Sequence, residues 1–178
     1  MEWMFMPLKR YAEFSGRSRR MEYWMWVLFQ VLLGCAFLIA IVSMAGSALL
    51  AGDANQALAS GGSVIVLVLI WVLVSLAFFI PNLAVTVRRL HDTNRSGWWM
   101  MLYWGPYLLS IFTAPSFVTM GSNTDTMAAL GGASLALSGI WFLGCLVLLV
   151  FMFLDGTPGP NAYGPDPKGR ADAGSVFA

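Results

Sequence analysis

The stretch RRLHDTNRSGWW, residues Arg88–Trp99, separates two strongly apolar halves of the chain and decides how the rest folds. It holds the only histidine of the sequence, His91, and ends in a tryptophan pair that opens the next apolar segment. Basic residues and tryptophans gather where a membrane helix meets the lipid headgroups. The stretch therefore predicts the point at which two membrane helices turn at one face of a bilayer.

The composition argues against an ordinary soluble domain. Of the 178 residues, 58% are hydrophobic and 11% are charged, whereas a soluble domain carries about 25% charged residues. The length suits one compact unit. The formal net charge of +1 gives no indication of a nucleic-acid partner, which a strongly basic chain would give.

Four apolar segments are long enough to cross a bilayer core of about 30 Å, for which about 20 helical residues are needed. We predict spans at about residues 23–50, 63–87, 98–120 and 133–154. None of them contains Asp, Glu, Lys, Arg or His. Ion-coupled transporters usually need such a residue at depth, so its absence disfavours that class.

Polar segments flank these spans. A basic and aromatic segment at 1–22 precedes the first span, small polar residues at 51–62 and 121–132 predict loops, and a Gly/Pro-rich tail follows at 155–178. Helix-breaking residues interrupt the third span, at Gly105–Pro106 and at Pro115. A re-entrant pair of short helices is therefore the alternative to a full crossing there.

The basic residues predict the orientation. They lie before the first span, in the central polar stretch and in the tail: Lys9, Arg10, Arg17, Arg19, Arg20, Arg88, Arg89, Arg95, Lys168 and Arg170. The two loops contain only Asp53 and Asp125 as charged residues. Four crossings put all three basic segments on one side, which the positive-inside rule makes cytoplasmic. We predict an all-α membrane protein with four transmembrane helices and both N and C termini cytoplasmic.

Two prolines carry local predictions. Pro7 suits the first turn of a short helix with Leu8, Tyr11 and Ala12 on one face, which would lie in the headgroup layer as an N-terminal interfacial helix. A flexible terminus is the alternative. Pro81 frees a backbone carbonyl within the second span, and Asn82 is expected to bond either to that backbone or to a neighbouring helix.

No cofactor or metal is expected. Cys35 and Cys145 both lie inside apolar runs and suit small hydrophobic packing positions. No further cysteine and no second histidine exists to complete a metal site.

The central polar stretch offers three interpretations. If the second helix continues through it, Arg88, His91, Asp92 and Arg95 share one face, so that Asp92 pairs with Arg88 or orients the His91 ring. Ser96 is placed to cap the next helix. The residues then set topology and tie helix ends together, bind a lipid phosphate or another anion, or use His91 as a general base. The indication that His91 is a general base is weak, because no nucleophile accompanies the histidine.

Three motifs together resemble a known family. FSGRSRRMEYW (14–24), RRLHDTNRSGWW (88–99) and GTPGPNAYGPDP (156–167) are similar, in order and spacing, to small bacterial inner-membrane proteins grouped as domain of unknown function 805. The resemblance covers about residues 7–168 and implies a multi-span inner-membrane protein, but no activity. Family-typical positions are Gly16, Arg17, Arg20, Trp24, Arg88, Arg89, His91, Asp92, Ser96, Gly97, Trp98, Asn161, Tyr163 and Gly164.

The resemblance also implies that the three motifs converge on the cytoplasmic face. The tail motif would then be a docked turn, anchored by Tyr163, rather than a disordered end. The expected polar layer, either structural or a site for an anion or lipid headgroup, comprises Arg17, Arg20, Arg88, Arg89, His91, Asp92, Arg95, Ser96, Asn161 and Tyr163.

The leading functional hypothesis is a non-enzymatic accessory, interaction or lipid-contacting protein. Its expected partners are membrane phospholipids, other membrane subunits or a second copy of the chain. A small transporter or channel is the alternative, because Pro81 and Pro106 allow helices to kink. Membrane-embedded catalysis on a phosphorylated headgroup is a third, and it requires His91 within hydrogen-bonding reach of Asp92.

Overall fold

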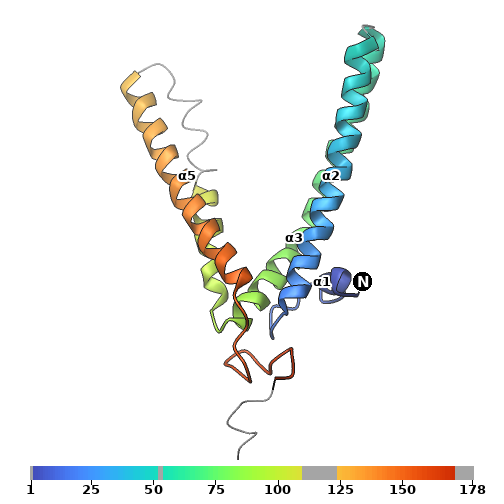
Figure 1. Ribbon diagram of the computed structural model, residues 1–178. Coiled ribbons are helices and arrows are strands. Elements are labelled where there is room, and N and C mark those ends of the chain that lie inside the picture. The colour runs from blue at the N-terminus through green and yellow to red at the C-terminus, as the bar shows by residue number, and fades with distance from the viewer. Residues whose placement is uncertain (1, 52–53, 110–123, 171–178) are drawn as a thin grey trace, which may run out of the picture. The chain divides into compact units, whose positions relative to one another are not determined.

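The computed structural model describes residues 2–51, 54–109 and 124–170. Every named element in these ranges is a helix (Figure 1), which confirms the all-α prediction for them. The chain divides into two compact units. The first comprises Met1–Phe14 and Met21–Thr86, and the second comprises Ser15–Arg20 and Val87–Ala178.

The first unit is built on a helical hairpin. Helix α2 covers Arg20–Ala51 and helix α3 covers Ala54–Asp92. In this unit the two helices run side by side (Figure 1), and the rings of Phe37 and Trp71 meet between them at 4.7 Å. Both helices are apolar over most of their length because lipid, rather than protein, is expected to cover their outer faces.

Polar side chains join the two helices of the hairpin. The Asn82 Oδ1 atom accepts hydrogen bonds from Trp26 Nε1 at 2.6 Å and from Gln30 Nε2 at 2.7 Å. Asn82 Nδ2 in turn donates to Gln30 Oε1 at 3.0 Å. Of the two expected partners for Asn82, the neighbouring helix is therefore the one observed.

The N-terminal helix differs from the prediction. Helix α1 covers Glu2–Lys9, so Pro7 lies inside it rather than in its first turn, and Tyr11 and Ala12 follow it. Glu2 favours the early start, because a carboxylate in the first turn complements the positive end of the helix dipole. The interfacial placement of this helix stays a prediction.

The two predicted loops are wrong over most of their length. Helix α3 already begins at Ala54, and helix α5, which covers Thr124–Phe153, begins well before Ala133. The stretches QALA at 56–59 and MAAL at 127–130 consist largely of strong helix formers. The small polar residues beside them are typical of loops, but they do not end the helix.

In the second unit, α5 packs against the segment that follows the central polar stretch. Helix η1 covers Gly97–Met100, and residues 101–109 continue as a helix. Trp99 meets Phe151 edge to face, with ring centroids 5.1 Å apart. A side chain at Gly144 would overlap the Leu102 carbonyl, so glycine lets these two backbones approach closely.

Three helical stretches are long and apolar enough to cross a membrane, within the part of the chain that the structure describes. They are Arg20–Gly46, Gly61–Asp92 and Gly131–Phe153, and they match three of the four predicted spans. The third predicted span is described only to residue 109. Residues 110–120 lie outside the described ranges, so four crossings and the orientation stay predictions.

Candidate functional site

Asp92 is the centre of a buried cluster, the arginine clamp, formed by Arg17, Arg89 and Asp92. Arg17 Nη2 lies 2.9 Å from Asp92 Oδ1, and Arg89 Nη1 binds Asp92 Oδ2. The three side chains are 1%, 0% and 3% exposed. A carboxylate at this depth is stable only with such partners, because burial without them costs several kcal/mol.

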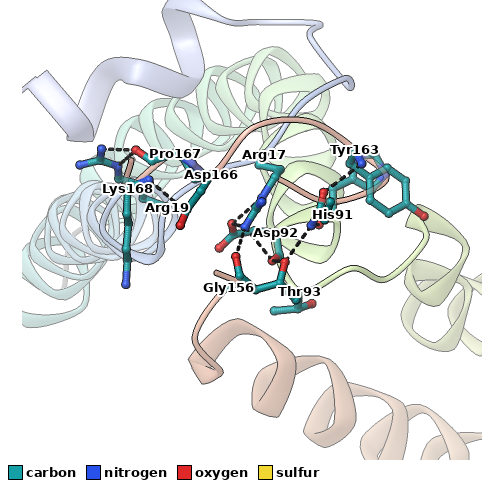
Figure 2. Close-up of polar contacts among 12 residues, drawn as sticks. Arg17, Arg19, His91, Asp92, Thr93, Gly156, Tyr163, Asp166, Pro167 and Lys168 are labelled. Atoms are coloured by element: carbon teal, nitrogen blue, oxygen red, sulfur yellow. Dashed lines mark hydrogen bonds and ion pairs between the residues drawn. The ribbon is translucent and has the colours of Figure 1, made fainter. Parts of the chain in front are cut away.

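Arg17 also holds the tail (Figure 2). Its guanidinium donates to the carbonyl oxygens of Gly159 at 2.7 Å and Thr157 at 2.6 Å, besides its bond from Nε to Asp92 Oδ1 at 3.0 Å. A weaker contact reaches the Asp92 carbonyl at 3.4 Å. One planar side chain with five donors thus connects the end of α3 with the segment after α5.

Helix α3 ends in a Schellman motif. Arg95 N donates to Leu90 O at 2.9 Å and Asn94 N donates to His91 O at 3.0 Å, while Asn94 has a φ of 57°. Asparagine tolerates this left-handed conformation better than most residues. The motif explains why the helix stops at Asp92, within the polar stretch.

The tail also binds two of the last carbonyl groups at this helix end. Thr157 N donates to Asp92 O at 2.9 Å, and Asn161 Nδ2 donates to His91 O at 2.9 Å. The last carbonyls of a helix have no partner inside it. Residues distant in sequence therefore complete α3.

Arginines cap α5 in the same way. Arg89 donates to the carbonyl oxygens of Met152, at 3.4 Å, and Leu154, and Arg20 Nη1 donates to Phe153 O at 2.9 Å. A cation at a helix C-terminus is favourable because the helix dipole is negative there. Arg89 thus contacts both Asp92 and the end of α5.

The predicted tail turn is present. Asn161 and Gly164 exchange backbone hydrogen bonds of 3.0 and 3.1 Å, and Asn161 Oδ1 accepts from Tyr163 N at 2.9 Å. Gly164 has a φ of 136°, a conformation that favours glycine. The Tyr163 ring stacks on His91, with centroids 3.9 Å apart and planes inclined by 5° (Figure 2).

His91 and Asp92 bind different partners. His91 Nδ1 donates to Gly16 O at 3.2 Å, and because a carbonyl only accepts, Nδ1 carries the proton. The ring makes no hydrogen bond to Asp92 among the described residues. Successive residues of a helix point about 100° apart, so the predicted orientation of His91 by Asp92 is wrong.

The other predicted roles need correction. Asp92 binds Arg89, three residues back, and not Arg88; Arg88 is fully buried, and its carbonyl accepts from Ser18 N at 3.1 Å. Arg95 follows the end of α3 and lies over the Phe151 ring, 4.0 Å from its centroid. Ser96 takes the N-cap position of η1, but its side chain makes no capping bond.

Residues 11–165 match the sequence profile of a family described as "Protein of unknown function (DUF805)". The chain belongs to the DUF805 family. The resemblance drawn from the three motifs is therefore confirmed, and the matched range includes the clamp and the tail turn.

Relatives of this DUF805 chain span nearly its whole length. Inner membrane protein YhaI of Escherichia coli K12 is 34% identical over 168 residues, which cover 94% of this chain and 97% of the relative. Inner membrane protein YhaH of the same organism is 32% identical, with coverage of 94% and 98%. No solved structure matches the chain. The predicted location in the inner membrane is confirmed by these relatives and by the apolar helices.

The sequence alone did not indicate several residues of the polar layer in this DUF805 chain. Arg19 donates from Nε to the Pro167 carbonyl at 2.5 Å, and Arg170 Nε donates to Asp166 Oδ2 at 2.7 Å. Gly156 lies against the Asp92 carboxylate, where a side chain would overlap it. The motif GTPGPNAYGPDP contains Gly156, Asp166 and Pro167, but only the fold shows what each one touches.

The tail of this DUF805 protein should stay docked in moderately acidic solution. The hydrogen bond from Arg170 lowers the pKa of Asp166 from 3.8 to about 2, so the carboxylate stabilises the tail fully above about pH 4 and less as the pH falls through about 2. Hydrogen exchange at the Lys168 amide, which donates to Asp166 Oδ1 at 2.9 Å, should remain slow at pH 4 and lose its protection near pH 2. Loss of this protection already at pH 5 would contradict the assignment of the transition to Asp166. The same loss of protection near pH 2 in Asp166→Asn would also contradict it.

Proposed function

We propose that this DUF805 chain is a non-enzymatic accessory or interaction protein of the membrane, with a rigid polar layer that presents a contact surface to phospholipids or to another subunit. The supporting observation is the burial of Arg17, Arg89 and Asp92, whose charged groups bind one another and backbone carbonyls. Arginines used in this way hold a fold together. They leave few donors for a substrate.

We place this layer on the cytoplasmic side and infer four crossings with both termini inside. All of the basic residues lie in the three segments that contribute to or flank the layer. The sequence between the spans contributes only Asp53 and Asp125 as charged residues. Positively charged loops stay on the cytoplasmic side.

Catalysis is disfavoured by the chemistry of the layer. A general base needs an orienting partner and a reachable proton. The Asp92 carboxylate is already used by two guanidinium groups, so it is not available to pair with His91 or to accept a proton from a substrate. We therefore propose a binding role rather than an enzymatic one.

The contact surface comprises the side chains of the layer that remain accessible. Trp98 is 76% exposed, and His91 and Tyr163 form a half-buried stacked pair. Trp98 follows Arg95 closely in sequence, and such a combination of indole and guanidinium is typical of headgroup depth. Phospholipid is therefore the partner that this surface fits best.

The test compares what remains bound to the purified protein. We expect Trp98→Ala and His91→Ala, extracted in a gentle detergent and studied by native mass spectrometry, to lose several-fold of the retained phospholipid or partner subunit. The melting temperature should stay unchanged in Trp98→Ala and fall in His91→Ala, which also loses its bond to Gly16 O and its stack on Tyr163. Leu135→Ala is the matched control, because Leu135 is also 76% exposed but lies on α5, away from the charged residues. Full retention in both variants, or solute flux in proteoliposomes, would defeat the proposal in favour of a purely structural layer or a transporter.

A further inference from the structure

Helix α3 contains a carbonyl group that its own backbone cannot satisfy. Pro81 lies inside the helix and has no N–H, so the carbonyl of Ala77, four residues earlier, receives no helical hydrogen bond. Ala77 lies in a charge-free run that extends from Ser63 to Val87. A helix carbonyl that has no backbone donor is bonded instead by a side chain or by water where either can reach it.

Tyr11 supplies the missing hydrogen bond. Its hydroxyl group donates to Ala77 O at 2.6 Å, although 66 residues separate the two in sequence. Asn82, the polar residue next to Pro81, directs its side chain to α2 instead and donates to Gln30 Oε1 at 3.0 Å. The Tyr11 hydroxyl group is thus the donor that the structure shows at this carbonyl.

The N-terminal segment is held in place by aromatic contacts. Phe5 of α1 meets Phe29 of α2 edge to face, with ring centroids 5.3 Å apart. Phe29 stacks on Trp26, and Trp26 meets Phe78 of α3 at 5.1 Å. These contacts bring α1 beside the hairpin (Figure 1), so that the residues just after α1 reach the proline break.

We infer that residues 2–14 act as a strap that closes the proline break of α3 through the Tyr11 hydroxyl group. Each end of the arrangement then depends on the other. When the strap lifts, the Ala77 carbonyl loses its donor, and when Ala77 has another donor, the Tyr11 bond holds the strap less strongly because the carbonyl is already bonded. Such reciprocal dependence is what defines two coupled elements.

A double-mutant cycle tests this coupling. In Pro81→Ala the new amide donates to Ala77 O, which makes the Tyr11 hydroxyl group redundant. A neutral hydrogen bond corresponds to a change of roughly fivefold in an opening equilibrium. We therefore expect Tyr11→Phe to speed hydrogen exchange of residues 2–14 and 78–86 about fivefold in nanodiscs, and by less than about twofold in the Pro81→Ala background.

Tyr163→Phe is the control, because it also removes one phenolic hydroxyl group but no hydrogen bond from that group to a described residue. It should leave exchange in residues 2–14 unchanged. Equal effects of Tyr11→Phe in both backgrounds would overturn the inference, as would no effect in either. Because both single substitutions keep or improve helix propensity, folded protein is expected for every arm of the cycle.

Discussion

Asp92→Asn should unfold the polar layer while leaving the helical hairpin of the first unit intact. The substitution keeps the shape of the side chain but removes the carboxylate that binds both Arg17 and Arg89, so two buried guanidinium groups lose their shared ion-pair partner. Breaking a buried ion pair by removing one partner costs about 3–5 kcal/mol. The free energy of unfolding should fall by that amount, and trypsin should cut faster after Lys168 in the released tail.

The matched control is Glu13→Gln. Glu13 pairs with Arg10 at 2.7 Å and is also three residues from its arginine, but its side chain is 45% exposed. Exposed ion pairs contribute about 0–1 kcal/mol, so this variant should behave like wild type. Comparable losses in the two variants would show that burial of the clamp does not set its strength. Thermal unfolding in detergent, followed by tryptophan fluorescence, measures both.

Gly156→Ala should displace the tail without changing any charge. The added methyl group would overlap the Asp92 carboxylate, which two arginines hold in place. Overpacking of this kind costs about 1–3 kcal/mol, and here it also pushes Thr157 away from the Asp92 carbonyl, to which it donates at 2.9 Å. Hydrogen exchange at the Thr157 amide should therefore speed up at least tenfold.

Gly139→Ala provides the comparison, because a side chain at Gly139 meets nothing within 4 Å and alanine suits a helix. That variant should keep wild-type protection of the tail. If Gly156→Ala kept it as well, the close contact between the tail and Asp92 would be wrong, and with it the docked position of Thr157.

The apolar runs were sufficient to predict the long helices, because a charge-free stretch in lipid has few alternatives to a helix. The helix ends were not predictable in the same way. Residues 54–62 and 124–132 combine small polar residues with strong helix formers, and the former suggested loops where the latter prevailed. Composition gives the class of a segment more reliably than its boundary.

The partners of Asp92 show where sequence reasoning ends. Arg88 and Arg89 are both within helical reach of Asp92, and local spacing cannot choose between them. Arg17 lies 75 residues away, and Thr157 lies 65 residues away on the other side. Only the packing of three separate segments brings these groups together, whereas the motifs themselves indicated which residues would take part.

The capping of α3 by the tail also sets an order of events during biosynthesis. Arg17 leaves the ribosome early, yet the Thr157 carbonyl that it binds follows 140 residues later. The Arg17 guanidinium therefore stays hydrated, and cannot complete its hydrogen bonds, until translation has nearly finished. A protein truncated before Thr157 would keep its apolar helices but expose an arginine cluster that lacks two of its carbonyl partners.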